Sequence, residues 1–200
     1  MREIGLLVVA MLLVACRGES DLPWNDDFSD PSTWQGESDA TAQVGVQDGV
    51  MRVYVAVPDQ LAWAVAGRDL RDFHLIVEAT QSAGPDDNEY GVLVRMQDHS
   101  NFYRFSISGD GYYLVSKFVD GRAEFLGSNW APSEIIHRGQ ATNVLEIICQ
   151  GPEMIFVVNG EELARVEDGQ FTHGDVGLYA GTFYEGGVDV HFDNLMVVEP

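Results

Sequence analysis

The chain has 200 residues, 46% of them hydrophobic and 10% aromatic, a composition typical of a globular protein with a sizeable core. Its 11 basic residues against 32 acidic ones give a formal net charge of −21. Because this charge repels phosphate groups, it argues against nucleic acid and anionic lipid headgroups as direct partners.

The first fifteen residues have the pattern of a secretory signal peptide. Arg2 supplies a positive charge, and the apolar run at 4–15 is too short to span a bilayer, which takes about 20 residues. The run ends in Leu-Val-Ala-Cys at 13–16, which resembles the lipobox of bacterial lipoproteins. The resemblance implies that Cys16 is lipidated after export and that its acyl chains hold the protein on the cell membrane or the outer membrane. An ordinary signal peptide with an incidental cysteine is the alternative.

The rest of the chain divides simply. Residues 16–25 are interpreted as a short polar tether, and residues 26–200 as one extracytoplasmic domain. With Cys16 lipidated, no intrachain disulfide is available to Cys149. Cys149 lies in the apolar run 144–149, so we expect a buried core residue rather than a nucleophile.

Short apolar or alternating runs follow one another through the domain and predict β-strands. They lie at 50–55, 73–79, 90–96, 102–108, 112–119, 143–149, 154–158, 162–166, 176–179 and 188–198. Turn sequences join neighbouring runs at 47–49, 109–111, 120–121 and 159–160, each with Asp-Gly or Asn-Gly. These dipeptides tolerate the positive φ of tight hairpins, so we expect an all-β, antiparallel sandwich or barrel.

The domain resembles the concanavalin A-like lectin/glucanase superfamily, a two-sheet jelly roll, and within it the laminin G-like and 3-keto-disaccharide hydrolase-type domains. The likeness depends on four stretches: 26–30 with Trp34, 90–95 with 101–105, 156–161, and 174–178 with 192–195. It implies an antiparallel two-sheet jelly-roll sandwich. It says little about function, because this superfamily includes lectins, glycan hydrolases and adhesion modules.

The sequence lacks the common catalytic and metal-binding motifs. Glucanases of the resembled superfamily place three carboxylates on one strand as Glu-x-Asp-x-Glu, so that all three face one glycosidic bond. No such run occurs, and neither a zinc-protease motif nor a nucleophile elbow is present. We therefore favour a non-catalytic protein, although an acidic pair contributed by two separate strands would leave no such motif.

No cofactor is certain, but a structural calcium ion is a candidate. Hard cations prefer carboxylate and carbonyl oxygens. Since the first and last strands pair in the resembled fold, Asp26, Asp27 and Asp193 are the candidate ligands, and the acidic loop 85–89 is a second possibility. A solvated acidic surface is the alternative.

Three basic residues fall on successive predicted strands of this acidic chain, namely Arg95, Arg104 and Lys117. If strict alternation holds and Leu114 faces the core, these cations share the outer face of one sheet. Aromatic rings beside them would stack on sugar rings, and arginine would bind hydroxyls or carboxylates. The predicted ligand-binding residues are Arg95, Phe102, Arg104, Tyr113, Lys117 and Trp130. Plain charge compensation on the surface is the alternative.

Three functions remain open at this point. The first is a membrane-anchored module that binds a glycan without catalysis. The second is an envelope domain that binds a protein partner. The third is a glycoside hydrolase of the 3-keto-disaccharide hydrolase type, which requires two carboxylates that converge in a cleft.

Overall fold

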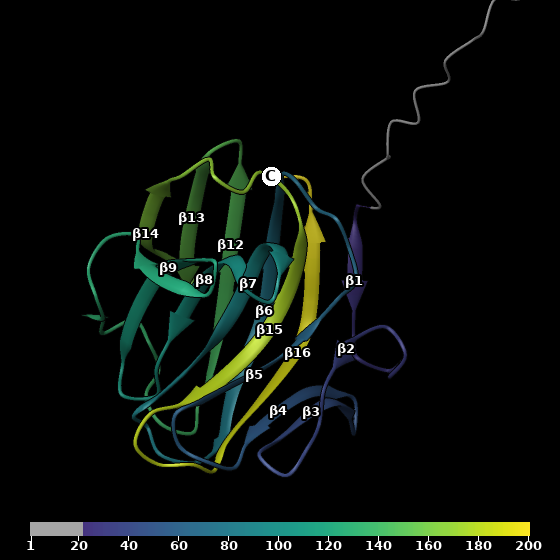
Figure 1. Ribbon diagram of the computed structural model, residues 1–200, viewed down its shortest axis with the longest axis vertical. Coiled ribbons are helices and arrows are strands. Elements are labelled where there is room, and N and C mark those ends of the chain that lie inside the picture. The colour runs from purple at the N-terminus through teal and green to yellow at the C-terminus, as the bar shows by residue number, and fades with distance from the viewer. Residues whose placement is uncertain (1–21) are drawn as a thin grey trace, which may run out of the picture.

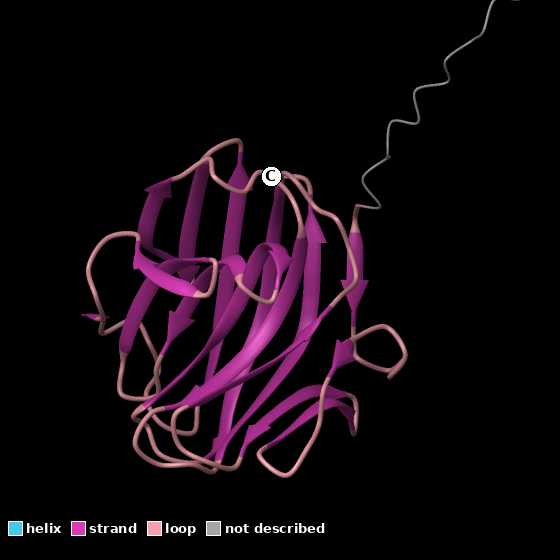
Figure 2. Cartoon of the chain, in the orientation of Figure 1, coloured by secondary structure: helices cyan, strands magenta, loops and turns pink. Residues whose placement is uncertain are grey.

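The computed structural model describes residues 22–200, which fold into a two-layer β-sandwich (Figure 1, Figure 2). Within these residues there is no helix, and hence no helix that is long and apolar enough to cross a membrane. The predicted signal peptide, Cys16 and most of the predicted tether lie outside the described residues.

The back sheet in Figure 1 has the order β14-β13-β12-β6-β16-β4-β3, with β1 added along β16, and all its pairs are antiparallel. Its strands are β1 (Trp24–Asp26), β3 (Ala42–Gln47), β4 (Val50–Val55), β6 (Phe73–Ala83), β12 (Thr142–Gln150), β13 (Glu153–Val158), β14 (Glu161–Glu167) and β16 (Val188–Val198).

The front sheet has the order β10-β9-β8-β7-β15-β5-β2, with β11 added along β9. Its strands are β2 (Gln35–Gly36), β5 (Gln60–Val65), β7 (Asn88–Asp98), β8 (Asn101–Ile107), β9 (Tyr112–Val119), β10 (Arg122–Phe125), β11 (Ala131–Pro132) and β15 (Asp175–Thr182). The all-β, antiparallel two-sheet jelly roll is therefore confirmed.

All four predicted turns join antiparallel partners. The turns at 47–49, 109–111, 120–121 and 159–160 connect β3–β4, β8–β9, β9–β10 and β13–β14. At Asn159 and Gly160 the φ angles are 51° and 83°, the pair of left-handed conformations that a tight hairpin needs and that this dipeptide tolerates.

The main core lies between the two sheets and is apolar. In β12 the burial alternates from residue to residue, with Leu145, Ile147 and Cys149 fully buried. Cys149 is thus a core residue as expected, and burial raises the pKa of its thiol to about 12. The described residues 22–200 contain sixteen strands and this continuous core, which is enough for one domain to fold.

The sandwich begins slightly before the predicted domain boundary. Trp24 starts β1, pairs with Val197 of β16 and is buried, although it belongs to the segment interpreted as tether. The pairing of the first and last strands, on which the calcium prediction depended, is present.

The front sheet has apolar side chains on both of its faces. Its inner face packs on the back sheet, whereas Leu93, Met96, Phe102 and Tyr179 form a second, separate cluster on the outer face. This explains why β7 and β8 are buried along nearly their whole length rather than alternately. The outer face of the front sheet is where a partly enclosed surface arises.

Candidate functional site

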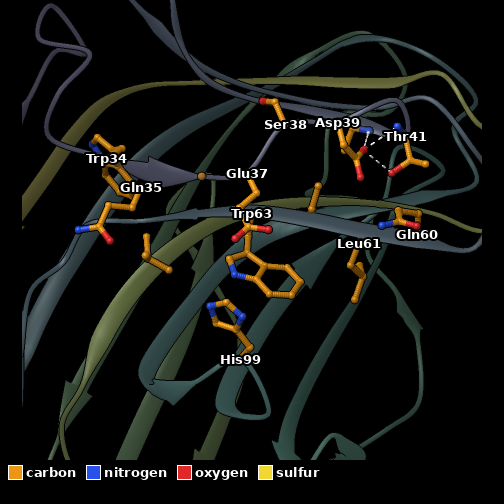
Figure 3. A pocket seen from close by; sticks show the side chains of 14 residues that line it. Trp34, Gln35, Glu37, Ser38, Asp39, Thr41, Gln60, Leu61, Trp63 and His99 are labelled. Atoms are coloured by element: carbon orange, nitrogen blue, oxygen red, sulfur yellow. Dashed lines mark hydrogen bonds between the residues drawn. The ribbon is translucent and has the colours of Figure 1, made fainter.

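A groove of about 680 Å³ runs along β5 at the edge of the front sheet (Figure 3). The strand β5 provides its floor, and the segment that follows β2 provides one wall. The β7–β8 hairpin reaches in from the opposite side. Its polar and aromatic lining residues include Gln35, Glu37, Asp39, Gln60, Trp63 and His99.

Trp63 lies at the centre of this groove. It projects from the outer face of β5, where it packs against the second apolar cluster and remains partly exposed. The His99 ring meets its edge, with the ring centroids 5.7 Å apart and the planes at 85° (Figure 3). Part of a large aromatic surface is thus held in place and open to the groove.

His99 reaches Trp63 because the β7–β8 hairpin departs from regular pairing. The register between these strands shifts between Val94 and Asp98, and Arg95 has a φ of 50°. Such a bulge bends the strand and increases its twist. The end of the hairpin therefore lies close to β5, although β15 separates β7 from β5 in the sheet.

Several polar groups in the groove have no protein partner. Among the described residues, no hydrogen bond engages the side chains of Glu37 or Gln60, or the indole N–H of Trp63. Asp39 differs, because its Oδ1 accepts hydrogen bonds from the backbone N–H and hydroxyl of Thr41, both at 2.7 Å, and these bonds lower the pKa of Asp39. Asp39 shapes the loop, whereas Glu37 and Gln60 are available to a ligand.

A buried polar row crosses the middle of the same outer face. The Nη1 of Arg104 lies 3.0 Å from Oε2 of Glu89, and its Nε donates a hydrogen bond to Ser116. The hydroxyl of Tyr179 is hydrogen-bonded to the hydroxyl of Ser106 and to the carboxylate of Glu89. Burial raises the pKa of the Glu89 carboxyl, and the positive charge of Arg104 opposes that rise.

The predicted ligand-binding patch is present only in part. Phe102 and Arg104 do face the outer side of the front sheet, where Phe102 stacks on Phe118 with centroids 4.7 Å apart. Both are buried, with exposed fractions of 3% for Phe102 and 7% for Arg104. Their role in ligand binding stays a prediction.

The prediction that Arg95 lies on that outer face is wrong. Arg95 is fully buried, and its guanidinium donates hydrogen bonds to the carbonyl oxygens of Arg71, Gly151 and Phe171. The reason is the bulge at Arg95, which interrupts the alternation of side chains assumed for this strand. Arg95 joins loops of the two layers instead of facing a ligand.

The predicted orientation of β9 is also wrong. Tyr113 lies opposite Ile107 and packs on the main core, and Lys117 lies opposite Tyr103 on the inner face. Lys117 reaches the rim of the sandwich, where its Nζ contacts Asp168 at 2.8 Å. The assumption that Leu114 faces the main core reversed the whole strand, because side chains alternate with a period of two.

Trp130 lies apart from the groove. It precedes β11, and its ring meets that of Phe183 edge to face, with centroids 5.9 Å apart. It lines a different cavity at one end of the front sheet.

The three candidate calcium ligands already hold local structure. The oxygens of Asp26 accept hydrogen bonds from the backbone N–H of Phe28 and the indole N–H of Trp34, at 2.8 and 2.9 Å. Asp27 and Asp193 accept from backbone N–H groups close to them in sequence. Across residues 22–200, no three His, Cys, Asp or Glu side chains converge as a metal site. Calcium binding stays a prediction.

The sequence reasoning missed the groove because it missed β5. In β5 the small residues Ala62 and Ala64 face the core, and the bulky Leu61, Trp63 and Val65 face outward. Both faces are apolar, so the alternation of polar and apolar residues that marks a half-buried strand is absent. The exposed Glu37 and His99 carry no pattern that links them to Trp63.

The two antiparallel sheets and their arrangement define a concanavalin A-like β-sandwich. Among solved structures, the carbohydrate-binding module CBM66 from Bacillus subtilis aligns with a TM-score of 0.66 and 14% identity over 85% of this chain and 98% of that one. The β-glucanase of Bacillus licheniformis aligns with a TM-score of 0.68 and 11% identity over 89% and 98%. At these identities the likeness concerns the fold.

The sequence family is more specific. The profile of the 3-keto-alpha-glucoside-1,2-lyase-like domain matches residues 23–198, so the chain belongs to this family. No curated protein sequence matches the chain. The resemblance to the concanavalin A-like superfamily and its 3-keto-disaccharide hydrolase-type domains is confirmed.

Proposed function

We propose that the groove along β5 binds a carbohydrate without cleaving it. The observation that carries this proposal is the partly exposed ring of Trp63, which meets His99 in a groove that the unpartnered side chains of Glu37 and Gln60 also line. The groove volume of about 680 Å³ is in the range that accommodates a small ligand.

The chemistry of these side chains matches that of a sugar ring. A pyranose has an apolar face of C–H groups, which stacks on an indole, and a rim of hydroxyls that both donate and accept hydrogen bonds. The Gln60 amide provides donors and an acceptor, and the Glu37 carboxylate accepts from hydroxyls. Neutral glycans suit this groove better than anionic ones, because Glu37 and Asp39 line it and no Arg or Lys does.

The comparisons with known proteins also support a carbohydrate ligand. A carbohydrate-binding module and a β-glucanase share this fold, and the family is named for a reaction of glucosides. An exported, lipid-anchored protein would meet glycans outside the cell. We include lipidation of Cys16 in the proposal, on the strength of the sequence pattern at 13–16.

Calorimetric titration of residues 22–200 with neutral oligosaccharides, chosen from a glycan array, tests the proposal. Trp63→Ala should weaken binding by at least about tenfold, and Gln60→Ala by a few fold, since a tenfold loss corresponds to about 1.4 kcal/mol. Phe125→Ala, which removes an exposed ring on β10, is the matched control and should bind as the parent does. A folded protein that binds no glycan would contradict the proposal and favour a protein partner.

A catalytic reading has one specific observation in its favour. Glu37 and His99 both line the groove that holds Trp63, so the groove contains two titratable side chains able to move a proton. In a 1,2-elimination from a 3-keto-glucoside, a base takes the C2 proton, which the neighbouring ketone acidifies. The C1–C2 double bond forms as the aglycone oxygen leaves C1 and takes up a proton from the second side chain. Appearance of an absorbing enone from a 3-keto-glucoside, abolished in both Glu37→Gln and His99→Ala, would establish this reading over simple binding.

A further inference from the structure

A second cavity, of about 570 Å³, lies at one end of the front sheet, and we call it the end pocket. Five residues from four loops line it: Asp59, Asp87, Trp130, Phe183 and Tyr184. These residues precede β5, β7 and β11 or follow β15, which ends among the loops at the lower edge of the sandwich in Figure 1. Three of the five are aromatic and the other two are acidic.

The aromatic part of the end pocket has a defined geometry. The Trp130 and Phe183 rings meet at 89° with centroids 5.9 Å apart, and Tyr184 is 88% exposed beside them. Trp130 has a φ of 42°, a left-handed conformation that is unusual for a bulky residue. The backbone thus holds a large aromatic ring at the cavity at a conformational cost.

The acidic part of the end pocket has no basic partner. Among the described residues, no ion pair or side-chain hydrogen bond engages the carboxylates of Asp59 and Asp87, which are both exposed. The cation–π contacts found among the described residues, those of Arg52, Arg68 and Arg104, involve rings outside the end pocket. Two uncompensated carboxylates and three aromatic rings therefore line one cavity.

We propose that the end pocket binds an organic ammonium group. Aromatic faces attract cations through their quadrupole, and carboxylates add a direct charge interaction. A metal ion fits less well, because rings do not ligate metals and no group of three ligand side chains occurs in the described chain. A neutral sugar can donate hydroxyls to the two carboxylates but leaves their negative charge uncompensated, so positive charge is the feature that this pocket selects.

The ammonium group has two chemical sources. Asp59 lines the end pocket and its neighbour Gln60 lines the groove, so an amino sugar in a glycan that passes along β5 would bring its amine to this pocket. A free quaternary ammonium compound presents the same charge without a glycan. This inference does not depend on the groove binding carbohydrate, because the two cavities have different lining residues.

Isothermal titration of residues 22–200 with choline and with glucosamine tests the proposal. Each cation is paired with a neutral counterpart of similar shape, 3,3-dimethylbutanol for choline and N-acetylglucosamine for glucosamine. We expect at least one cation to bind at least about tenfold more tightly than its counterpart. Preference for choline identifies a quaternary ammonium ligand, and preference for glucosamine identifies an amino sugar.

Two variants locate the binding at the end pocket. Asp59→Asn/Asp87→Asn should weaken the cation by about tenfold or more, and Tyr184→Ala, which truncates a mostly exposed ring, by about threefold. The control Asp48→Asn/Asp120→Asn also removes two negative charges, at turns with positive φ that asparagine tolerates. It should leave the affinity for the cation unchanged. Equal affinity for the neutral counterparts, equal loss in the control, or no heat from either cation up to about 10 mM would overturn the proposal.

Discussion

Glu89 and Arg104 form a buried ion pair on the outer face of the front sheet. The Nη1 of Arg104 lies 3.1 and 3.0 Å from the two carboxylate oxygens, and the side chains are only 7% and 9% exposed for Glu89 and Arg104. Removal of one partner leaves an uncompensated charge away from water. Glu89→Gln is therefore expected to lower the free energy of unfolding by about 3 kcal/mol, measured by guanidinium denaturation of residues 22–200.

A double-variant cycle separates the pair from its surroundings. Glu89→Gln/Arg104→Met should lose clearly less stability than the two single variants lose together, because neither charge is then stranded. Strict additivity would contradict a direct coupling between the two side chains. Arg165→Met, which removes an exposed arginine at the edge strand β14, should leave the unfolding midpoint nearly unchanged.

Asp168 is expected to make the free energy of unfolding fall at acid pH. Burial alone would raise its pKa, but hydrogen bonds from Lys117, Tyr103 and the backbone N–H of Gln170 hold the pKa below the ordinary value of 3.8. The folded protein keeps Asp168 ionised to lower pH than the unfolded chain does. Its contribution is thus complete above the ordinary pKa and is lost as pH falls through the folded pKa.

Asp168→Asn is the corresponding experiment. It should lower the unfolding free energy at pH 7 and flatten the decline of stability between about pH 4 and pH 2. Thermal unfolding at a series of pH values measures both effects. Asp48→Asn, at an exposed turn, serves as the control, and an unchanged decline at acid pH in Asp168→Asn would show that other carboxylates produce it.

Substitution of Arg95 is expected to lower the stability of the fold rather than the affinity for a ligand. Its guanidinium is fully buried and engages three backbone carbonyl oxygens and Asp72. Arg95→Leu leaves these carbonyls without a donor, so we expect a loss of about 3 kcal/mol in unfolding free energy with no specific change in glycan affinity. Arg122→Leu, exposed on β10, is the matched control. Full stability of Arg95→Leu would mean that water replaces the guanidinium.

Lipidation of Cys16 is expected to place the protein on a membrane. If the sequence at 13–16 is a lipobox, the full chain expressed in a bacterium should incorporate a labelled fatty acid and partition with membranes. Cys16→Ser should abolish both properties, whereas Cys149→Ser, a change in the buried core, should leave the labelling intact. Label retained in Cys16→Ser would refute lipidation at this site.

The sequence predicted the class of fold because the signals for it are local. Asn159–Gly160 and the other tight turns require positive φ over adjacent residues, and alternation along 144–149 marks a strand with one buried face. Both features can be recognised within about ten residues. The hairpins β3–β4, β8–β9, β9–β10 and β13–β14 follow from these turns, whereas pairs between distant strands, such as β6 with β16 and β7 with β15, do not.

The site escaped the same reasoning for two physical reasons. A single bulge at Arg95 breaks the period-two alternation, and a wrong choice of face for Leu114 reverses every side chain of β9. The strand β5 has apolar residues on both faces, so no alternation distinguishes its core side from its ligand side.

By itself, then, the sequence determined an antiparallel β-sandwich of the concanavalin A-like type with one buried cysteine. The tertiary structure alone decided which side chains meet. Glu37, Trp63 and His99 are separated by more than twenty residues along the chain, and they share a groove only because the bulged hairpin and the edge of the front sheet lie together. Contacts of this kind depend on how whole strands pair and bend, which no short stretch of sequence specifies.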